Sequence, residues 1–478
     1  MKRLILLSAL TLLTACAVRP RAQVEPTPFV RIDGRPRLVI GLYEHLDDEP
    51  SLTEAAAAGF NLIYCGASRT SLDRMQAHGL YGWVNLGGTL ALQEGDEAGR
   101  QKLTDTVNRL KDHPALLVWE GPDEPLWNIW YAPWLRIGDT AMPALRKVID
   151  EQPPGQQAQL IAMAKRCDDY WRRAMWVDGE KLYDDIWRRM NQPPFEWSPR
   201  ITSARQRADK LGDELSRGFE LVGVIDPGRV RWLNHAPRNS VGAMQHYNRH
   251  VDMAGCDIYP MPASRPPGHS DLPVPNATAV GAYTDRMREA APGKIIAMVL
   301  QGFGWVDSWG TDPPSNKDFR RPTRRELRFM CYNALAHGTG AILFFGTSHI
   351  EKDSQFWRDL LAVTRELRTL EPALVAGPRD GEVTCVADEG MPSQDGDAVQ
   401  LMFRQIGEEF VLVAINERKA GVTFTVSDLP PALKGRTLYR LGSDESHVIG
   451  AGQLRDGIGG HDVHVYSTSR AFGVEPNM

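Results

Sequence analysis

Eight short apolar runs, separated by segments with helical periodicity, constrain the fold of this chain more than any other feature. The runs lie at residues 37–43, 61–66, 81–86, 115–120, 230–235, 253–259, 294–300 and 341–345. Most of them are uninterrupted, as is typical of parallel strands buried on both faces. Helical patterns lie between them, for example at 51–58, 71–78, 99–111, 277–290 and 323–336. Eight such strand–helix units predict an α/β fold, a (β/α)8 TIM barrel over residues 36–372, with its chemistry on the loops after the strands.

A doubly wound open sheet is the alternative fold for the same alternation of strands and helices. That fold binds its ligands on glycine-rich turns, but no GxGxxG or GxxxxGK turn opens any of these helices. The barrel is therefore the preferred interpretation.

Two segments interrupt the strand–helix rhythm. About a hundred residues, roughly 126–228, follow the fourth run and hold seven of the 13 tryptophans. They have a helical character, and we expect this insertion to cap the barrel mouth. Residues 375–478 contain short alternating runs bounded by Gly, Pro, Asp and Asn, which predict an antiparallel β-sandwich. These runs lie at 398–404, 409–415, 422–426, 437–441 and 462–466.

The N-terminus has the pattern of a secretory signal peptide over residues 1–16. Lys2 and Arg3 precede an apolar run at 4–13, and small residues follow. The sequence Leu13-Thr14-Ala15-Cys16 resembles the lipobox of bacterial lipoproteins, which implies a lipid on Cys16 and a tether over residues 17–35. Alanine after this cysteine resembles the pattern of outer-membrane sorting, so we expect anchoring in the cell envelope, on its periplasmic or surface face. An ordinary signal peptide with a chance cysteine is the alternative.

Composition and cysteine spacing exclude several classes of function. A formal net charge of −5 and the absence of a basic tract argue against nucleic-acid binding. Beyond Cys16, five cysteines remain, without a CxxC pair or a histidine at zinc-ligand spacing. No phosphate-binding loop is present either. We therefore expect no metal and no cofactor.

Three carboxylates crowd the end of the fourth predicted strand. Glu120, Asp123 and Glu124 lie within the sequence HPALLVWEGPDEP at residues 113–125. Like charges and apolar neighbours shift carboxyl pKa values apart, so that one group holds a proton while another stays ionised. A solvated acidic loop is the alternative, but the flanking tryptophans and prolines argue against full solvation.

This segment resembles the fourth-strand signature of clan A glycoside hydrolases, in which a strand ends in Asn-Glu-Pro. The resemblance implies that Glu124 is the general acid/base and that Asp123 replaces the asparagine that binds a sugar 2-hydroxyl. The sequence Asp257-Ile258-Tyr259-Pro260 resembles the end of the sixth strand of these enzymes, where a tyrosine orients the nucleophile. Residues 301–304 and 321–328 resemble uncharacterised glycosidase-like barrel proteins of bacteria.

The sequence departs from this family at the nucleophile. Retaining members carry a glutamate after the seventh strand, where this chain has Gln301. A neutral amide cannot form a glycosyl-enzyme ester, so another carboxylate serves, water is activated in an inverting reaction, or sugars are bound without cleavage. Glu44 after the first strand and Asp257 after the sixth are the candidate catalytic substitutes, while Asp307 and Asp312 lie in a longer loop. Glu44 is equally suited to bind hydroxyl groups, and Asp257 to accept backbone hydrogen bonds.

We expect a second set of residues to bind substrate. Its members are Tyr259 and Gln301 in the central subsite, Trp119, Trp127 and Trp305 as stacking platforms, His235 after the fifth strand, and Glu120. The sequence thus predicts an enzyme, a glycosidase that acts on a poly- or oligosaccharide. A non-catalytic carbohydrate-binding surface lipoprotein is the main alternative, and a purely structural envelope protein is a third. A second carboxyl group at roughly 5 to 10 Å from Glu124 would favour the enzyme.

Overall fold

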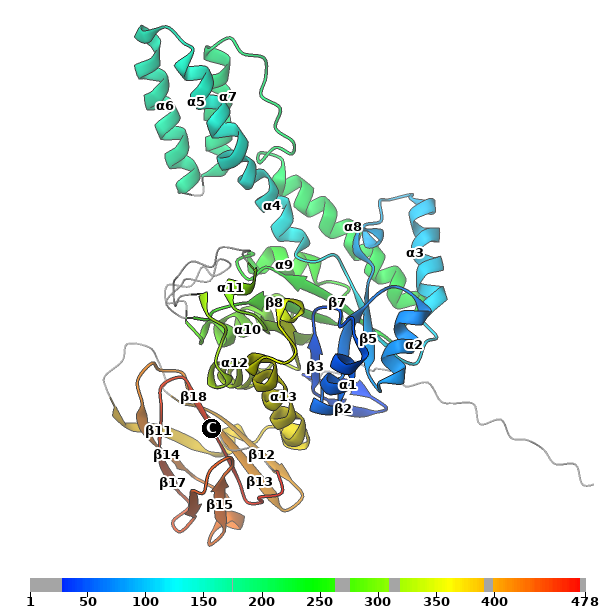
Figure 1. Ribbon diagram of the computed structural model, residues 1–478, viewed down its shortest axis with the longest axis vertical. Helices are drawn as coiled ribbons and strands as arrows, with labels where there is room; N and C mark the ends of the chain where they lie inside the picture. Colours follow the sequence, from blue (N-terminus) through cyan, green and yellow to red (C-terminus); the bar gives the residue numbers. More distant parts are fainter. Residues whose placement is uncertain (1–27, 174, 263–275, 309–318, 391–398, 473–478) are drawn as a thin grey trace, which may run out of the picture.

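The computed structural model describes residues 28–472 except 174, 263–275, 309–318 and 391–398. Eight parallel strands close into a barrel, in the order β10-β3-β4-β5-β6-β7-β8-β9 (Figure 1). They are β3 (Val39–Leu42), β4 (Leu62–Cys65), β5 (Tyr81–Asn85), β6 (Leu116–Glu120), β7 (Val230–His235), β8 (Met253–Ile258), β9 (Ile295–Gln301) and β10 (Ala341–Phe345). The predicted (β/α)8 barrel is confirmed.

The N-terminal segment is described only from residue 28. The predicted signal peptide, Cys16 and most of the predicted tether therefore lie outside the described residues. Within the part of the chain that is described, no helix has both the length and the apolar character needed to cross a membrane. The first described elements, β1 (Val30–Ile32) and β2 (Arg35–Arg37), form a hairpin whose apolar residues join the core inside the barrel.

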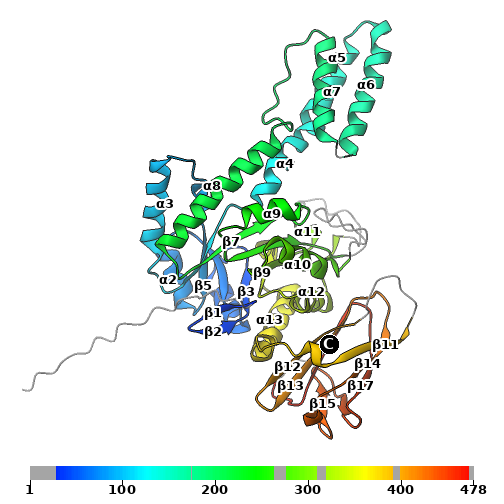
Figure 2. The same ribbon diagram turned by 180° about the vertical axis from the view of Figure 1, so that it is seen from behind.

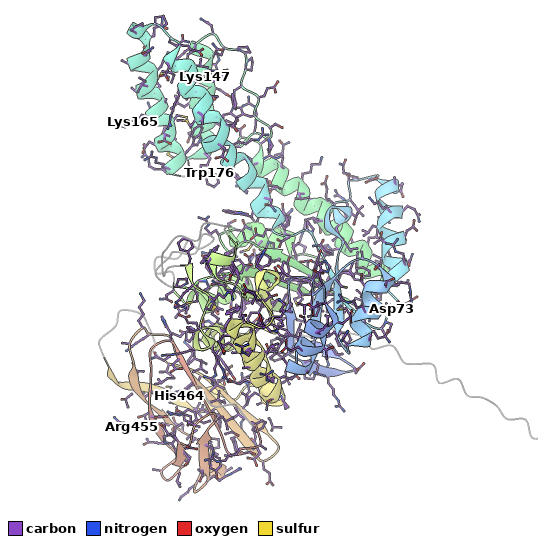
Figure 3. The ribbon with its side chains drawn as sticks, in the orientation of Figure 1. Asp73, Lys147, Lys165, Trp176, Arg455 and His464 are labelled. Carbon is purple, nitrogen blue, oxygen red and sulfur yellow. The ribbon has the colours of Figure 1, made fainter. Side chains whose placement is uncertain are left out.

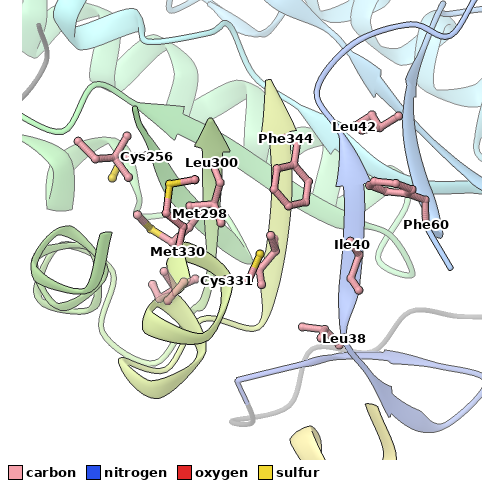
Figure 4. Packing of buried hydrophobic residues seen from close by; sticks show 14 of the residues in the cluster. Leu38, Ile40, Leu42, Phe60, Cys256, Met298, Leu300, Met330, Cys331 and Phe344 are labelled. Carbon is pink, nitrogen blue, oxygen red and sulfur yellow. The ribbon is translucent and has the colours of Figure 1, made fainter. Parts of the chain in front are cut away.

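Successive residues of each barrel strand point alternately into the barrel and out toward the helices. Val39, Val118 and Trp232 belong to the inner cluster, whereas Ile40 and Leu42 of β3 and Phe344 of β10 belong to the outer one. Figure 4 shows these outer residues together with Met330 and Cys331 of a covering helix. This alternation of period two decides which residue at each strand end reaches the barrel mouth, which we define as the end formed by the carboxyl ends of the strands.

Helices follow the strands around the barrel. They are α1 (Glu49–Ala58), α2 (Arg69–Ala77), α3 (Glu97–Leu110), α9 (Val241–Tyr247), α10 (Ala279–Ala290), α12 (Arg324–Ala336) and α13 (Gln355–Leu374). Three of them begin two residues before the predicted start, because Asp48, Ser68 and Asp96 act as N-caps. Thr323 and Glu326 form a capping box at the start of α12.

The insertion after β6 forms a helical arm. Its elements are α4 (Pro125–Arg136), a π-helical turn (Ile137–Ala141), α5 (Met142–Asp150), α6 (Pro154–Arg172), α7 (Trp176–Arg189) and α8 (Ala204–Ile225). Figures 1 and 2 show α5, α6 and α7 projecting away from the barrel, and Figure 3 places Lys147 and Lys165 on this projecting part. The expectation that the insertion caps the mouth is wrong, because its apolar residues, including Trp171 and Trp197, are buried in a core of its own.

The C-terminal region is an antiparallel β-sandwich, as predicted. One sheet has the order β11-β14-β17 and the other β12-β13-β18-β15-β16. Its strands are β11 (Thr384–Gly390), β12 (Val399–Ile406), β13 (Glu409–Asn416), β14 (Val422–Ser427), β15 (Thr437–Arg440), β16 (Ser446–Val448), β17 (Leu454–Ile458) and β18 (Asp462–Ser467). Three of these strands, β11, β16 and β17, were not predicted. The second sheet packs on α12 and α13, so Val411 and Val465 join the core that surrounds the barrel.

Candidate active site at the barrel mouth

Four carboxyl groups converge at the barrel mouth from two strand ends. Glu120 is the last residue of β6, Asp123 and Glu124 follow it, and Asp257 lies near the end of β8. Asn234, on the intervening strand β7, bridges the carboxyls from these two strand ends. Its Nδ2 donates to Oδ1 of Asp123 at 2.9 Å and to Oδ1 of Asp257 at 3.3 Å. The structure therefore brings Asp123, Glu124 and Asp257 together, three of the predicted catalytic candidates.

Glu120 lies beneath this cluster and is buried. Its Oε2 accepts hydrogen bonds from Trp83 Nε1 at 3.1 Å and Asn85 Nδ2 at 2.8 Å, and its Oε1 lies 2.5 Å from the Tyr43 hydroxyl. Burial raises the pKa of Glu120 to about 8, and the negative charge of Asp123 raises it as well. Glu120 is thus largely protonated at neutral pH, in a position below the open mouth.

Glu124 combines strain in its backbone with a perturbed side chain. Its φ of +42° lies in the left-handed region, which is costly for a residue with a Cβ atom and is often found at functional sites. Burial raises the pKa of Glu124 far above its usual range, and the charge of Asp257 and a hydrogen bond with that carboxyl raise it further. The pair therefore holds a proton at neutral pH, which suits a general acid.

Asp123 is the most exposed residue of this carboxyl cluster. Its Oδ1 lies 2.8 Å from the Tyr43 hydroxyl, in addition to its bond from Asn234. The surrounding protein limits the hydration of this carboxyl and raises its pKa; the charge of Asp257 acts in the same direction, while the two hydrogen bonds lower the pKa.

Gln301 occupies the expected position after the seventh barrel strand but presents no free group to the mouth. It is fully buried. Its Oε1 accepts from the Met261 backbone N–H at 2.8 Å, and its Nε2 donates to the carbonyls of Met261 at 2.8 Å and Phe303 at 3.0 Å. The prediction that Gln301 lines the central subsite is therefore wrong. Its amide instead ties the loop after β8 to the loop after β9.

Two further predicted substrate-binding residues point away from the mouth. Trp119 is fully buried and donates from Nε1 to Asp226 Oδ2 at 2.9 Å. His235 is also fully buried, its Nε2 lies 2.8 Å from Asn248 Oδ1, and burial lowers its pKa to about 4. Both predictions are wrong for one reason: Glu120 and Asn234 point into the barrel, so their chain neighbours Trp119 and His235 point outward.

The other candidates for a second carboxylate have structural partners. Glu44 accepts from Thr347 Oγ1 and from the backbone and hydroxyl of Ser348, at the short helix η4 (Thr347–His349). Asp307 pairs with Arg321 at 2.8 Å and accepts from the Gly304 backbone. These contacts argue against the catalytic role expected for Glu44. Asp312 lies outside the described residues.

Aromatic side chains border the carboxyl cluster. Tyr259 stacks on Phe345 with ring centroids 5.7 Å apart, and the half-buried Trp305 lies 6.3 Å from Tyr259. Trp127 is half-buried, with the Arg238 guanidinium 5.0 Å from its ring centroid, so one of its faces is covered. Beside Asp123, a groove of about 420 Å³ runs toward the base of the helical arm, lined in part by Pro122. Trp305 is thus partly accessible to a sugar ring, whereas Tyr259 is buried and its ring is covered by Phe345.

Sequence reasoning missed three polar residues of the site, Tyr43, Asn85 and Asn234. Each lies at or next to the end of a barrel strand and points into the mouth. The signal was present, because Trp232 belongs to the interior of the barrel and residue 234 therefore shares its face. Applying the same alternation to β3 selects Tyr43 rather than Glu44.

One group elsewhere has metal-ligand spacing within the described residues. It consists of Glu445, His447 and Asp456 in the β-sandwich, whose ligand atoms lie within 4.8 Å of one another. Arg440 already lies 2.7 Å from Glu445 Oε2 and 3.6 Å from Asp456 Oδ2. Because a guanidinium neutralises both carboxylates, this group fits an ion-pair network better than a metal site.

Comparisons with known proteins show similarity in structure. No protein-family model matches the sequence, and no curated protein does. A solved structure described as a glycoside hydrolase aligns with a TM-score of 0.50 and 11% identity, over 94% of this chain and 96% of that chain. A family 5 glycoside hydrolase from Bacteroides vulgatus gives a TM-score of 0.49 and 10% identity, over 94% and 93% of the two chains. A β-galactosidase from Bacillus circulans sp. alkalophilus gives 0.48 and 11%, over 91% and 99%. The first of these alignments shows that the chain shares the fold of a glycoside hydrolase along nearly its whole length.

Proposed function

We propose that this protein is a glycoside hydrolase that cleaves glycosidic bonds of a poly- or oligosaccharide, with Glu124 as the general acid. The observation that supports this most is the Glu124 carboxyl itself. It lies at the mouth of a closed barrel beside Asp257, with its pKa raised far above the usual range. A carboxyl that keeps its proton at neutral pH is able to protonate the leaving glycosidic oxygen. The partly exposed ring of Trp305 is placed to offer an apolar face to a sugar.

We assign the second carboxylate to Asp257. Asp257 reaches the mouth from β8, whereas Glu124 follows β6. The two carboxyls therefore approach a sugar bound between them from two sides. The two carboxyls are in hydrogen-bond contact, closer than the roughly 5–5.5 Å of retaining pairs or 6.5–9.5 Å of inverting pairs. In this proposal a bound sugar separates the two groups. Asp123 binds a neighbouring hydroxyl.

A second candidate function is carbohydrate binding without cleavage. Two observations favour it: the position of the usual nucleophile holds an amide whose polar atoms all bond to backbone groups, and Glu124 and Asp257 lie in contact rather than apart.

A hydrolysis assay distinguishes the two functions. Purified full-length chain is incubated with a broad panel of polysaccharides, and new reducing ends are measured. The hydrolase proposal predicts cleavage of at least one glycan, lost in Glu124→Gln and Asp257→Asn and kept in Glu94→Gln, which changes an exposed glutamate elsewhere. Binding of a glycan that is never cleaved, with unchanged affinity in Glu124→Gln, would establish the second function instead.

We also propose that residues 1–16 direct export and that a lipid on Cys16 anchors the protein in the bacterial outer membrane. The proposal rests on the lipobox-like sequence alone. Cys16→Ser is expected to move the protein from the membrane fraction to the soluble fraction of the producing cell. Cys385→Ser serves as the control and is expected to stay with the membrane.

A further inference from the structure

Among the described residues, no positive charge balances the carboxyl cluster at the mouth. Burial, neighbouring carboxyls and neutral hydrogen-bond donors are the main causes that shift the pKa values of Glu120, Asp123 and Glu124, and no basic side chain is among them. Within the described part of the chain, no ion pair reaches these groups or Asp257.

Three other carboxyls of this chain that are buried or nearly so have arginine partners. Glu366 lies 2.7 Å from Arg328, Glu180 lies 2.9 Å from Arg200, and Asp252 lies 2.7 Å from Arg231. Pairing of this kind offsets the cost of removing a charge from water. The mouth therefore differs from these three sites.

The same cluster also has acceptors without donors. Asn234 is 2% exposed, and its Oδ1 receives no hydrogen bond from a described residue, although its Nδ2 is fully used. Oε1 of Glu124 is likewise buried and makes no hydrogen bond to a described residue. A buried acceptor without a partner is costly. As far as the described residues go, the site is thus short both of positive charge and of hydrogen-bond donors for Asn234.

A protonated amine supplies both a positive charge and hydrogen-bond donors. It carries one positive charge and three N–H donors and has no acceptor of its own. A hydroxyl group brings no charge, and an N-acetyl group brings a carbonyl oxygen that adds another acceptor to a site already rich in them.

We propose that the sugar bound at the mouth carries a free, protonated amino group, received by the carboxyls of Asp123 and Asp257 and by Oδ1 of Asn234, the residue that bridges them. The substrate class is then a poly- or oligosaccharide of amino sugars that are not N-acetylated. This inference rests on the proposed function in so far as the mouth binds a sugar. Glu124 is left with its proton for the leaving glycosidic oxygen.

Calorimetric binding to paired oligosaccharides tests the inference. The full-length chain is titrated at pH 6, which keeps the amine protonated, with glucosamine and N-acetylglucosamine tetramers and with the corresponding galactosamine pair. We expect at least one amino form to bind ten or more times tighter than its acetylated partner, a difference of about 1.4 kcal/mol. Asp123→Asn, which removes a charge with little change in shape, is expected to reduce this preference severalfold, and Glu94→Gln to leave it unchanged.

Equal affinity for amino and acetylated forms would overturn the inference, as would a preference that survives intact in Asp123→Asn. A tetralysine peptide that binds as tightly as the amino sugars would show attraction by charge alone and would also overturn it. The outcome remains separable from that of the proposed function. Cleavage of neutral glycans without amine preference refutes only this inference, whereas preferential binding of amino sugars without cleavage refutes only the hydrolase.

Discussion

The Tyr43 hydroxyl oxygen lies 2.5 Å from Oε1 of Glu120 and 2.8 Å from Oδ1 of Asp123. A tyrosine has one hydroxyl hydrogen, so it donates to one of these carboxyls and accepts from the other. Glu120 holds the second hydrogen, because its pKa is raised to about 8 and its Oε2 is already occupied by the donors of Trp83 and Asn85. A chain of hydrogen bonds therefore runs from Glu120 through Tyr43 to Asp123 at the mouth.

Removing the Tyr43 hydroxyl is expected to destabilise the protein. Tyr43→Phe leaves Oε1 of the buried Glu120 without its partner, and we expect the free energy of unfolding to fall by about 1–3 kcal/mol. Urea unfolding measures this loss. Tyr64→Phe is the matched control, because the Tyr64 ring lies 6.5 Å from that of Tyr43 at the same mouth, and its loss should stay within about 0.5 kcal/mol. Equal losses in the two variants would contradict the hydrogen-bonded chain.

Glu120 makes stability depend on pH in a definite direction. Its pKa is about 8 in the folded protein, against an ordinary value of 4.5. Below pH 4.5 the carboxyl is protonated in both states, and its contribution to stability is fully present. Between pH 4.5 and 8 the unfolded chain releases the proton while the folded chain keeps it, so this contribution is progressively lost as pH rises.

Comparison of the wild type with Glu120→Gln isolates this effect, because glutamine does not titrate. The free energy of unfolding of the wild type, minus that of the variant, should decrease from pH 4.5 to 8 in urea unfolding series. Glu94→Gln, at an exposed site, should show a difference that changes little over the same range. A difference that instead grows with pH would mean that Glu120 is ionised in the folded protein.

Trp119 and Trp305 should respond to substitution in opposite ways. Trp119→Phe leaves Asp226 Oδ2 without its buried donor, so we expect a loss of about 1–3 kcal/mol in unfolding free energy with glycan affinity unchanged. Trp305→Phe changes a half-buried ring near Tyr259 and should weaken glycan binding with little loss of stability. Urea unfolding and calorimetric titration measure the two effects. Weaker glycan binding by Trp119→Phe, with unchanged stability, would instead support the substrate-binding role that the sequence predicted for Trp119.

Much of the fold was predictable because most of the barrel strands are continuous apolar runs in the sequence. The beginnings of helices were less predictable, since the capping residue precedes the apolar pattern, as Asp48 does before α1. At the site, the position of Glu124 and Asp257 at strand ends was predictable. Their direct contact was not, because it depends on a left-handed backbone at Glu124 and on the Asn234 bridge between strands that are distant in sequence.

The position of the helical arm was also not predictable from its composition. Abundant tryptophan near an acidic loop suggested a lid, yet Trp171 and Trp197 pack against Tyr183 within the arm. Periodicity identifies an amphipathic helix, but it does not identify the surface that the apolar face covers.

A buried arginine, held by an ion pair between two barrel helices, joins the barrel to the β-sandwich. Arg328 of α12 binds Glu366 of α13 and donates to the Val463 carbonyl of β18. Arg328→Met leaves Glu366 as an unpaired buried charge, so we expect a loss of about 3–5 kcal/mol in unfolding free energy. Arg325 lies on the same helix and is more exposed; Arg325→Met removes its pair with Asp462 of β18 and its hydrogen bond to the Gly460 carbonyl, and it should cost at most about 1 kcal/mol. Thermal or urea unfolding of the two variants measures these losses in unfolding free energy. Similar losses in both would contradict a buried role for Arg328.

The most direct test of the account compares two leaving groups in the Glu124→Gln variant. The cleaved glycan needs protonation of its departing sugar oxygen, whereas a nitrophenyl glycoside of the same sugar departs without it. If Glu124 is the general acid, kcat on the glycan falls by about 10²–10⁴-fold and kcat on the nitrophenyl glycoside falls by less than about tenfold, with the wild type active on both. Equal losses on the two substrates, unchanged activity in the variant, or a wild type that cleaves neither substrate would contradict the assignment.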